Sequence, residues 1–303
     1  MCRPFWLAAP PVGSANLASD IGAAIRFFNC SIECHRCPCQ SLGQSLLERP
    51  LPAYLLPLFG VLLGLIIGSF LATLILRWPQ NLSVIGGRSV CDDCGHQLRA
   101  WELIPVVSFV MQSGKCRRCG APIANDHLAI ELAAALIGGL ALYAAPRIEA
   151  FAGAIFGWLL LTLAALDVKH HWLPDRLTAM LALSGLMASL LPVYPALPDR
   201  LIGGFAGIAA LAIIAAIYKG VRNRNGLGGG DPKMLGAIGC WLGWQALPLV
   251  LLGASVVGLL VALSWQLRGK PVTGDSMLPL GSLMAIAAFP LWLYQSADGG
   301  LFY

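Results

Sequence analysis

The sequence predicts an all-α polytopic membrane protein with about eight transmembrane helices and one small polar insertion. The chain is 57% hydrophobic and only 12% charged, whereas soluble domains carry about 25% charged residues. Long runs contain no charged side chain, and a polar stretch with two pairs of closely spaced cysteines separates the first run from the others. A chain of this kind buries its apolar surface in a lipid bilayer.

The uncharged runs define the expected helices. They cover residues 51–76, 132–146, 150–166, 177–198, 201–218, 234–267 and 276–297. A helix that crosses a bilayer needs about 20 apolar residues, so the run 234–267 is too long for one helix. Trp241, Gly243, Trp244 and Pro248 supply a turn and an interfacial aromatic pair, which divides this run into two short helices. The short run 132–146 is extended by residues 127–131.

Lysine and arginine residues predict the orientation, because the loops alternate between basic-rich and basic-poor after the first span. The basic side includes Arg88, Lys115, Lys169, Lys219 and Lys233, whereas the other side has only Arg147 and Arg200 beyond the first 50 residues. Basic loops remain in the cytoplasm, so we expect the polar insertion to be cytoplasmic. The net charge of +5 is thus a signal of topology, and no nucleic-acid partner is expected.

Four segments follow from this pattern. Residues 1–50 contain five cysteines and lack the apolar region of a signal peptide. We interpret them as an N-terminal extension that is disordered or that precedes the true start of the protein, with a metal-binding cluster as the alternative. Residues 51–77 form the first transmembrane helix, residues 78–127 the cytoplasmic insertion, and residues 128–303 a transmembrane core with about seven helices.

The insertion holds a candidate metal centre. Cys91 and Cys94 form one CxxC pair, Cys116 and Cys119 form the second, and a glycine follows each pair. Two pairs at this separation predict a zinc site with four thiolate ligands, and a reducing cytoplasm disfavours disulfides. The alternative is two redox-active or unbound CxxC pairs. Because so short a segment builds little hydrophobic core, zinc would supply folding energy, and a closed four-cysteine site indicates a structural role.

Two acidic residues adjoin apolar runs. Asp167 ends the run 150–166, and Asp231 follows the glycine-rich segment 226–230. An ionised carboxylate inside a bilayer costs about 2.5–3.5 kcal/mol on insertion scales, so such residues are functional candidates. Asp231 by itself could also be the cap of the helix that follows.

Both aspartates are expected at the cytoplasmic membrane edge, which suggests a paired-carboxylate site. Two neighbouring carboxylates do not both ionise cheaply, so the pair shares one proton. One member can then activate water as a general base, while the other polarises a carbonyl and protonates the leaving amine. A nearby lysine, Lys169 or Lys233, could lower the pKa of one member. Asp175, which follows a proline at the start of the next helix, is interpreted as a helix cap.

Together these motifs resemble the bacterial type IV prepilin peptidases, the bifunctional leader peptidases and N-methyltransferases among the GxGD intramembrane aspartyl proteases. The resemblance covers roughly residues 55–295 and is carried by the segment 60–71, the paired CxxC motifs with residues 104–108 and 114–123, Glu131, the motif from Asp167 to Asp175, and the motif from Gly230 to Lys233. Ala72 departs from the family pattern, because many members have asparagine there.

The resemblance implies that Asp167 and Asp231 are the catalytic pair. It implies cleavage of the basic leader of type IV prepilins or type II secretion pseudopilins after a glycine, at the cytoplasmic face of the bacterial inner membrane. It also implies methylation of the new N-terminus with S-adenosylmethionine, for which the sequence has no binding fingerprint. Glu131 is a candidate for positioning the substrate or the methyl donor, and the alternative is a buried acid paired with arginine or lysine.

Two other functions remain open at this point. A proton- or cation-coupled transporter could use the same aspartates, although transporters place such acids near the membrane midplane within broken helices. A scaffold without catalytic activity would not need both aspartates.

Overall fold

The computed structural model describes residues 54–80, 93–97, 99, 105–123, 125–145, 148–191, 194–223, 226–269 and 278–297. Within them the chain is helical, and an isolated β-bridge joins Lys115 to Pro122. The helices are α2 (Leu55–Arg77), α3 (Val107–Met111), α4 (Asn125–Ala144), α5 (Ile148–His170), α6 (Asp175–Met187), α7 (Leu197–Arg222), α8 (Asp231–Leu242), α9 (Leu247–Leu267) and α10 (Leu280–Ala297). The N-terminal extension predicted over residues 1–50 lies outside the described residues.

Six of these helices are long and apolar enough to cross a bilayer: α2, α4, α5, α7, α9 and α10. The helices α6 and α8 have 13 and 12 residues, which at 1.5 Å per residue is about 20 Å and 18 Å. The hydrocarbon core is about 30 Å thick, so neither short helix crosses it alone. The prediction of an all-α membrane protein is confirmed. Two of the eight predicted spans, those that correspond to α6 and α8, are too short to cross the bilayer alone.

The break predicted inside the run 234–267 is present. Helix α8 ends at Leu242, Gly243 has a φ of 77°, and α9 begins at Leu247. The extension of the short run 132–146 toward its N-terminus is also found, because α4 begins at Asn125.

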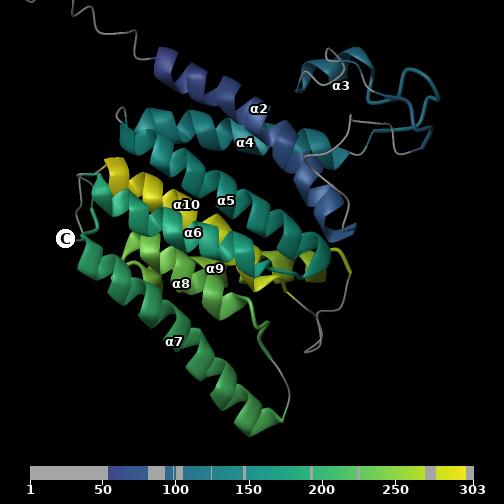
Figure 1. The fold of residues 1–303 in the computed structure, drawn as a ribbon. Helices are drawn as coiled ribbons and strands as arrows, with labels where there is room; N and C mark the ends of the chain where they lie inside the picture. The colour runs from purple at the N-terminus through teal and green to yellow at the C-terminus, as the bar shows by residue number, and fades with distance from the viewer. Residues whose placement is uncertain are drawn as a thin grey trace, which may run out of the picture. The chain divides into compact units, whose positions relative to one another are not determined.

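Glycines allow α2 to lie directly against α4 (Figure 1). Gly60, Gly64 and Gly68 follow one another at intervals of four residues and are all buried. A Cβ atom at Gly60 would overlap the carbonyl oxygen of Gly138, and one at Gly68 would lie 2.8 Å from the Cα of Glu131. Small residues at this spacing bring helix backbones together in membranes, where packing replaces the hydrophobic effect.

Helix α8 lies at the centre of the packing around α6, α7 and α10 (Figure 1), and its residues from Met234 to Leu242 are all buried. The Trp241 ring stacks on Phe156 of α5 with ring centroids 4.7 Å apart. The indole nitrogen of Trp241 donates a hydrogen bond of 2.8 Å to the carbonyl oxygen of Leu181 in α6. One side chain therefore fixes the position of α8 against two other helices, which matters because α8 begins at Asp231.

Candidate functional site

The two aspartates predicted to form a pair lie at the C-terminal end of α5 and at the N-terminal end of α8. Asp167 lies in the last turn of α5, and Asp231 is the first residue of α8. Their exposed fractions are only 5% and 7%. Carboxyl groups so deeply buried need polar partners, because their burial is otherwise costly.

Asp167 is held by a segment that belongs to neither predicted aspartate motif. Its Oδ2 atom accepts a hydrogen bond of 2.8 Å from the backbone N–H of Ser282 in the first turn of α10. Asp167 and Ser282 are 115 residues apart in the chain, so no local sequence signal could connect them. His171 also lies close enough to Asp167 for their charges to interact, although it was not predicted as a site residue.

Asp231 is held by its own glycine loop. Its Oδ2 atom accepts a hydrogen bond of 3.0 Å from the backbone N–H of Gly228. Burial raises the pKa of Asp231 to about 6; the Gly228 amide opposes this shift, and the negative charge of Asp167 adds to it. The influence of one aspartate on the other is the electrostatic signature of neighbouring carboxylates.

Leu173, in the loop between α5 and α6, links the segments that carry the two aspartates. A Cβ atom at Gly230 would lie 2.8 Å from the Cβ of Leu173. A Cβ atom at Gly281 would lie 3.0 Å from Leu173 Cδ1, 2.9 Å from Asp167 Oδ2 and 3.1 Å from the sulfur of Met234. Leu173, in the loop after Asp167, therefore contacts both Gly230, which precedes Asp231, and Gly281, which precedes Ser282.

The lysines near the motifs do not pair with the two aspartates, contrary to the expectation from sequence. Lys169 forms an ion pair of 2.7 Å with Asp126. Lys233 forms one of 2.6 Å with Asp175, whose side chain is 72% exposed. Asp175 is the first residue of α6, as the sequence predicts, and its charge suits the helix dipole there; the cap position itself is occupied by Pro174, and no side-chain capping bond forms.

The cysteines form a candidate metal centre, as predicted. The sulfur atoms of Cys94, Cys116 and Cys119 all lie within 4.8 Å of one another, and the predicted fourth ligand, Cys91, lies outside the described residues. The second pair forms a tight knuckle, in which the Gly120 N–H donates to the Cys116 carbonyl at 2.9 Å and Gly120 has a φ of 73°. Thiolates at this spacing fit a tetrahedral zinc ion.

Glu131 connects α4 to the insertion rather than to a basic residue. Its exposed fraction is 7%, and its Oε2 atom accepts a hydrogen bond of 2.8 Å from the backbone N–H of Val106. Val106 has a φ of 60°, which is a strained conformation for a β-branched residue. The buried acid thus contacts the start of α3, and the alternative of a pairing with arginine or lysine is not found among its described contacts.

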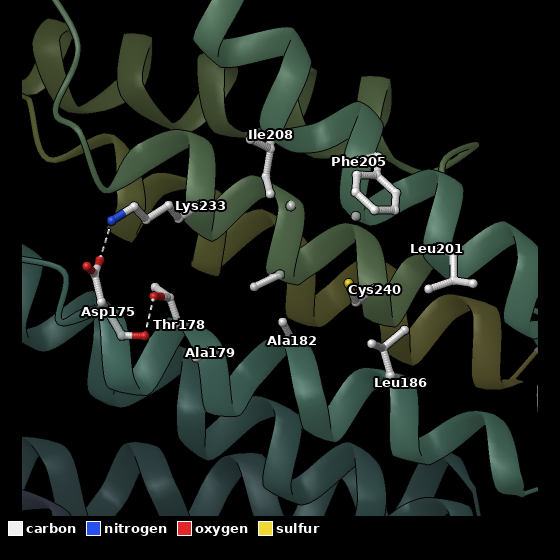
Figure 2. A pocket seen from close by; sticks show the side chains of 13 residues that line it. Asp175, Thr178, Ala179, Ala182, Leu186, Leu201, Phe205, Ile208, Lys233 and Cys240 are labelled. Carbon is white, nitrogen blue, oxygen red and sulfur yellow. Dashed lines mark hydrogen bonds and ion pairs between the residues drawn. The ribbon is translucent and has the colours of Figure 1, made fainter.

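A groove of about 450 Å³ lies between α6, α7 and α8 (Figure 2). Ala182, Phe205 and Ile208 are among its apolar lining residues, and the ion pair of Lys233 and Asp175 marks its polar end. Neither aspartate of the pair lines it. Cys240 lines the groove nine residues after Asp231, which places it on the opposite side of α8. The groove is therefore separate from the carboxylate pair.

Comparison with known proteins gives consistent matches. Residues 62–145 match the bacterial peptidase A24 N-terminal domain, and residues 154–263 match the type IV leader peptidase family. The prepilin leader peptidase/N-methyltransferase of Burkholderia pseudomallei (strain 1026b) is 36% identical over 254 residues, which are 75% of this chain and 82% of that protein. The protein of the same name from Dichelobacter nodosus is 33% identical over 291 residues, which are 86% of this chain and 98% of that protein. No solved structure matches the chain.

Proposed function

This chain belongs to the type IV leader peptidase family, and we propose that it cleaves the basic leader peptide of type IV prepilins or type II secretion pseudopilins after a glycine and then N-methylates the new N-terminal residue. The observation that carries this proposal is the buried pair of Asp167 and Asp231, which three separate segments of the chain bring together. The names of the relatives support both activities.

In the proposed mechanism, the two aspartates share one proton. The ionised aspartate takes a proton from a water molecule, whose oxygen attacks the scissile carbonyl carbon, and the protonated aspartate donates a hydrogen bond to the carbonyl oxygen. The tetrahedral intermediate then collapses: the C–N bond breaks, and the amine leaves with a proton from the pair. No covalent bond to the protein forms. The raised pKa of Asp231 supports this sharing, because it keeps a proton available closer to neutral pH.

The position of the pair suits a substrate that is itself a membrane helix preceded by a polar leader. Both aspartates lie at helix ends rather than inside broken helices, which favours the peptidase over the transporter alternative. The distribution of lysine and arginine supports a multi-pass protein of the bacterial inner membrane with this end of the helices in the cytoplasm. The proposed division is a first span over 51–77, a zinc-binding insertion over 78–127 and a peptidase core over 128–303.

Zinc and S-adenosylmethionine have different places in this proposal. Cys91, Cys94, Cys116 and Cys119 would hold a structural zinc ion that stabilises the insertion. S-adenosylmethionine would supply the methyl group for the N-terminal amine. The Glu131 contact with Val106 supports a role for Glu131 in orienting the insertion, and the residues that bind the methyl donor remain unassigned.

The proposal is tested by co-expressing a prepilin with the wild type, Asp167→Asn or Asp231→Asn and analysing the N-terminus of the product by mass spectrometry. The amide keeps the shape of the carboxyl group but removes its titrating proton. We expect the wild type to cut after glycine and to add the mass of one methyl group. Both variants should insert in the membrane and leave the prepilin uncut, and cutting by both would disprove the aspartate mechanism.

A further inference from the structure

The start of α10 lies against Asp167, although it belongs to neither aspartate motif. We propose that Gly281 and the backbone amide of Ser282 are positioning residues for peptide cleavage: the glycine leaves room for the Asp167 carboxylate, and the amide holds its Oδ2 atom. This inference rests on the proposed function, because it assigns these residues to the same carboxylate pair. It adds a third segment to the site, far in sequence from the other two.

The amide contact is specific to the backbone. The N–H groups in the first turn of a helix have no partner within the helix, and the positive end of the helix dipole attracts an acidic side chain. The Ser282 N–H donates to Asp167 Oδ2 at 2.8 Å, whereas its hydroxyl donates to the carbonyl oxygen of Pro279 at 2.7 Å. Ser282 is only 3% exposed, so bulk water does not compete for this bond. The side chain and the amide of Ser282 therefore have separable tasks.

Glycine is required at position 281 because a side chain would not fit there, and not because of its backbone angles. Gly281 is not among the glycines with positive φ, so alanine could adopt its backbone angles. Its Cβ atom, however, would lie 2.9 Å from Asp167 Oδ2 and 3.0 Å from Leu173 Cδ1. Leu173 in turn packs against the residue before Asp231, so a shift of Leu173 would be passed on to the second aspartate.

Four variants, compared in detergent with a full-length prepilin as substrate, test this inference. Gly281→Ala adds one methyl group beside the carboxylate, and Gly220→Ala makes the same change at a helical glycine with open space around it. Ser282→Pro removes the amide hydrogen in the first turn, where proline is tolerated, and Ser282→Ala removes only the hydroxyl. A displacement of about 1 Å at a reacting group costs roughly 10²-fold in rate.

We therefore expect Gly281→Ala and Ser282→Pro to lower kcat for cleavage by about 10²-fold with an unchanged KM. Gly220→Ala should cut at nearly the wild-type rate, and Ser282→Ala, which keeps the amide, should cut clearly faster than Ser282→Pro. Methyl transfer to a synthetic peptide that begins at the mature N-terminus should persist in all four variants. This last measurement separates misplacement of the carboxylate from loss of the folded protein, which would abolish both activities.

Three results would overturn the inference. The first is wild-type cleavage by Gly281→Ala. The second is equal activity of Ser282→Pro and Ser282→Ala, which would remove the role of the amide. The third is a parallel loss of cleavage, methyl transfer and thermal stability in Gly281→Ala, which would mean that α10 only supports the fold. Prepilin cleavage by Asp167→Asn would instead disprove the proposed function itself. If Asp167→Asn does not cleave but Gly281→Ala cleaves at the wild-type rate, only the role of Gly281 and Ser282 is disproved.

Discussion

Replacing Arg200 with methionine should destabilise the protein strongly. Arg200 contacts the C-terminal ends of α6 and α8, whereas Asp231 lies at the N-terminal end of α8. Arg200 is only 2% exposed in the first turns of α7. Its guanidinium group donates hydrogen bonds to five backbone carbonyl oxygens, those of Pro195 at 2.7 Å, Gly185 at 2.9 Å, Cys240 and Trp241 at 3.2 Å, and Tyr194 at 3.4 Å. One side chain thereby joins the ends of two helices and the segment before α7.

The reason for this arrangement is the set of carbonyl groups at helix C-termini, which lack partners within their own helix. Helix α6 ends at Met187 and α8 ends at Leu242, so three of the five carbonyls that Arg200 binds, those of Gly185, Cys240 and Trp241, belong to the last turns of these helices. The negative ends of the two helix dipoles also favour the cation. A planar group with five donors suits this task better than an ammonium group.

The expected size of the effect follows from these contacts. Methionine fills much of the space but donates no hydrogen bond, so the buried carbonyls lose their partner. Leaving a buried acceptor without its donor costs about 1–3 kcal/mol, so the loss of several such bonds amounts to roughly 3–5 kcal/mol. Each kcal/mol lowers Tm by about 2–4 °C in a protein of 150–250 residues. We therefore expect Tm to fall by roughly 6–20 °C. Arg200→Lys keeps the charge but donates to fewer carbonyls, so its Tm should lie between that of the wild type and that of Arg200→Met.

The assay is thermal unfolding of the purified protein in detergent, followed by circular dichroism or by the fluorescence of its tryptophans. Arg222→Met, at the exposed end of the same helix, is the matched control and should melt with the wild type. If Arg200→Met melts within the roughly 2 °C that 1 kcal/mol produces, the carbonyls find other partners and the reasoning is wrong.

Three further predictions concern the sites. Cys116→Ser should abolish binding of zinc by the purified protein, measured by metal analysis, and metal content equal to the wild type would contradict the assigned ligand set. Glu131→Gln should preserve the bond to Val106, because an amide oxygen also accepts, whereas Glu131→Leu should make the insertion more sensitive to proteolysis; equal digestion of both variants would argue against the contact. Because burial raises the pKa of Asp231 to about 6, it is protonated below and ionised above that pH. Initial cleavage rates should therefore fall between about pH 6 and pH 8 as the pair loses its shared proton, and a flat profile would contradict the mechanism.

The parts of the fold that sequence predicts well depend on local chemistry. Uncharged runs locate the helices because the bilayer excludes charge over a fixed length. Gly95 and Gly120, which follow the two CxxC pairs, have φ values of 66° and 73°, a backbone conformation that glycine adopts readily and that allows a tight turn after each pair. Pro232 lies in the first turn of α8, as its missing amide hydrogen suggests.

The parts that sequence did not reveal depend on distant contacts. Arg200 was interpreted as one of two basic residues on the basic-poor side, because a charge count does not distinguish an arginine in water from one buried against helix ends. Ser282 contributes through its backbone, which every residue has, so its type carries no signal. The two lysines lie next to the aspartates in sequence yet pair with Asp126 and Asp175, because the helix directions carry their long side chains elsewhere.

The placement of the carboxylates at helix ends suits the proposed cleavage chemistry. A peptide bond inside a membrane helix is hydrogen-bonded along the backbone and shielded from water, so hydrolysis needs a point where the substrate helix has ended. Here Asp167 lies in the last turn of α5 and Asp231 begins α8, and a glycine loop with little side-chain bulk precedes Asp231. A Cβ atom at Gly229 would meet no neighbouring atom of the described residues within 4 Å, so an extended substrate strand can approach the loop backbone closely. The first turn of α10 supplies the amide donor to Asp167, and the glycine loop supplies the donor to Asp231. Helix ends and loops offer such free amide groups, whereas the middle of a span does not.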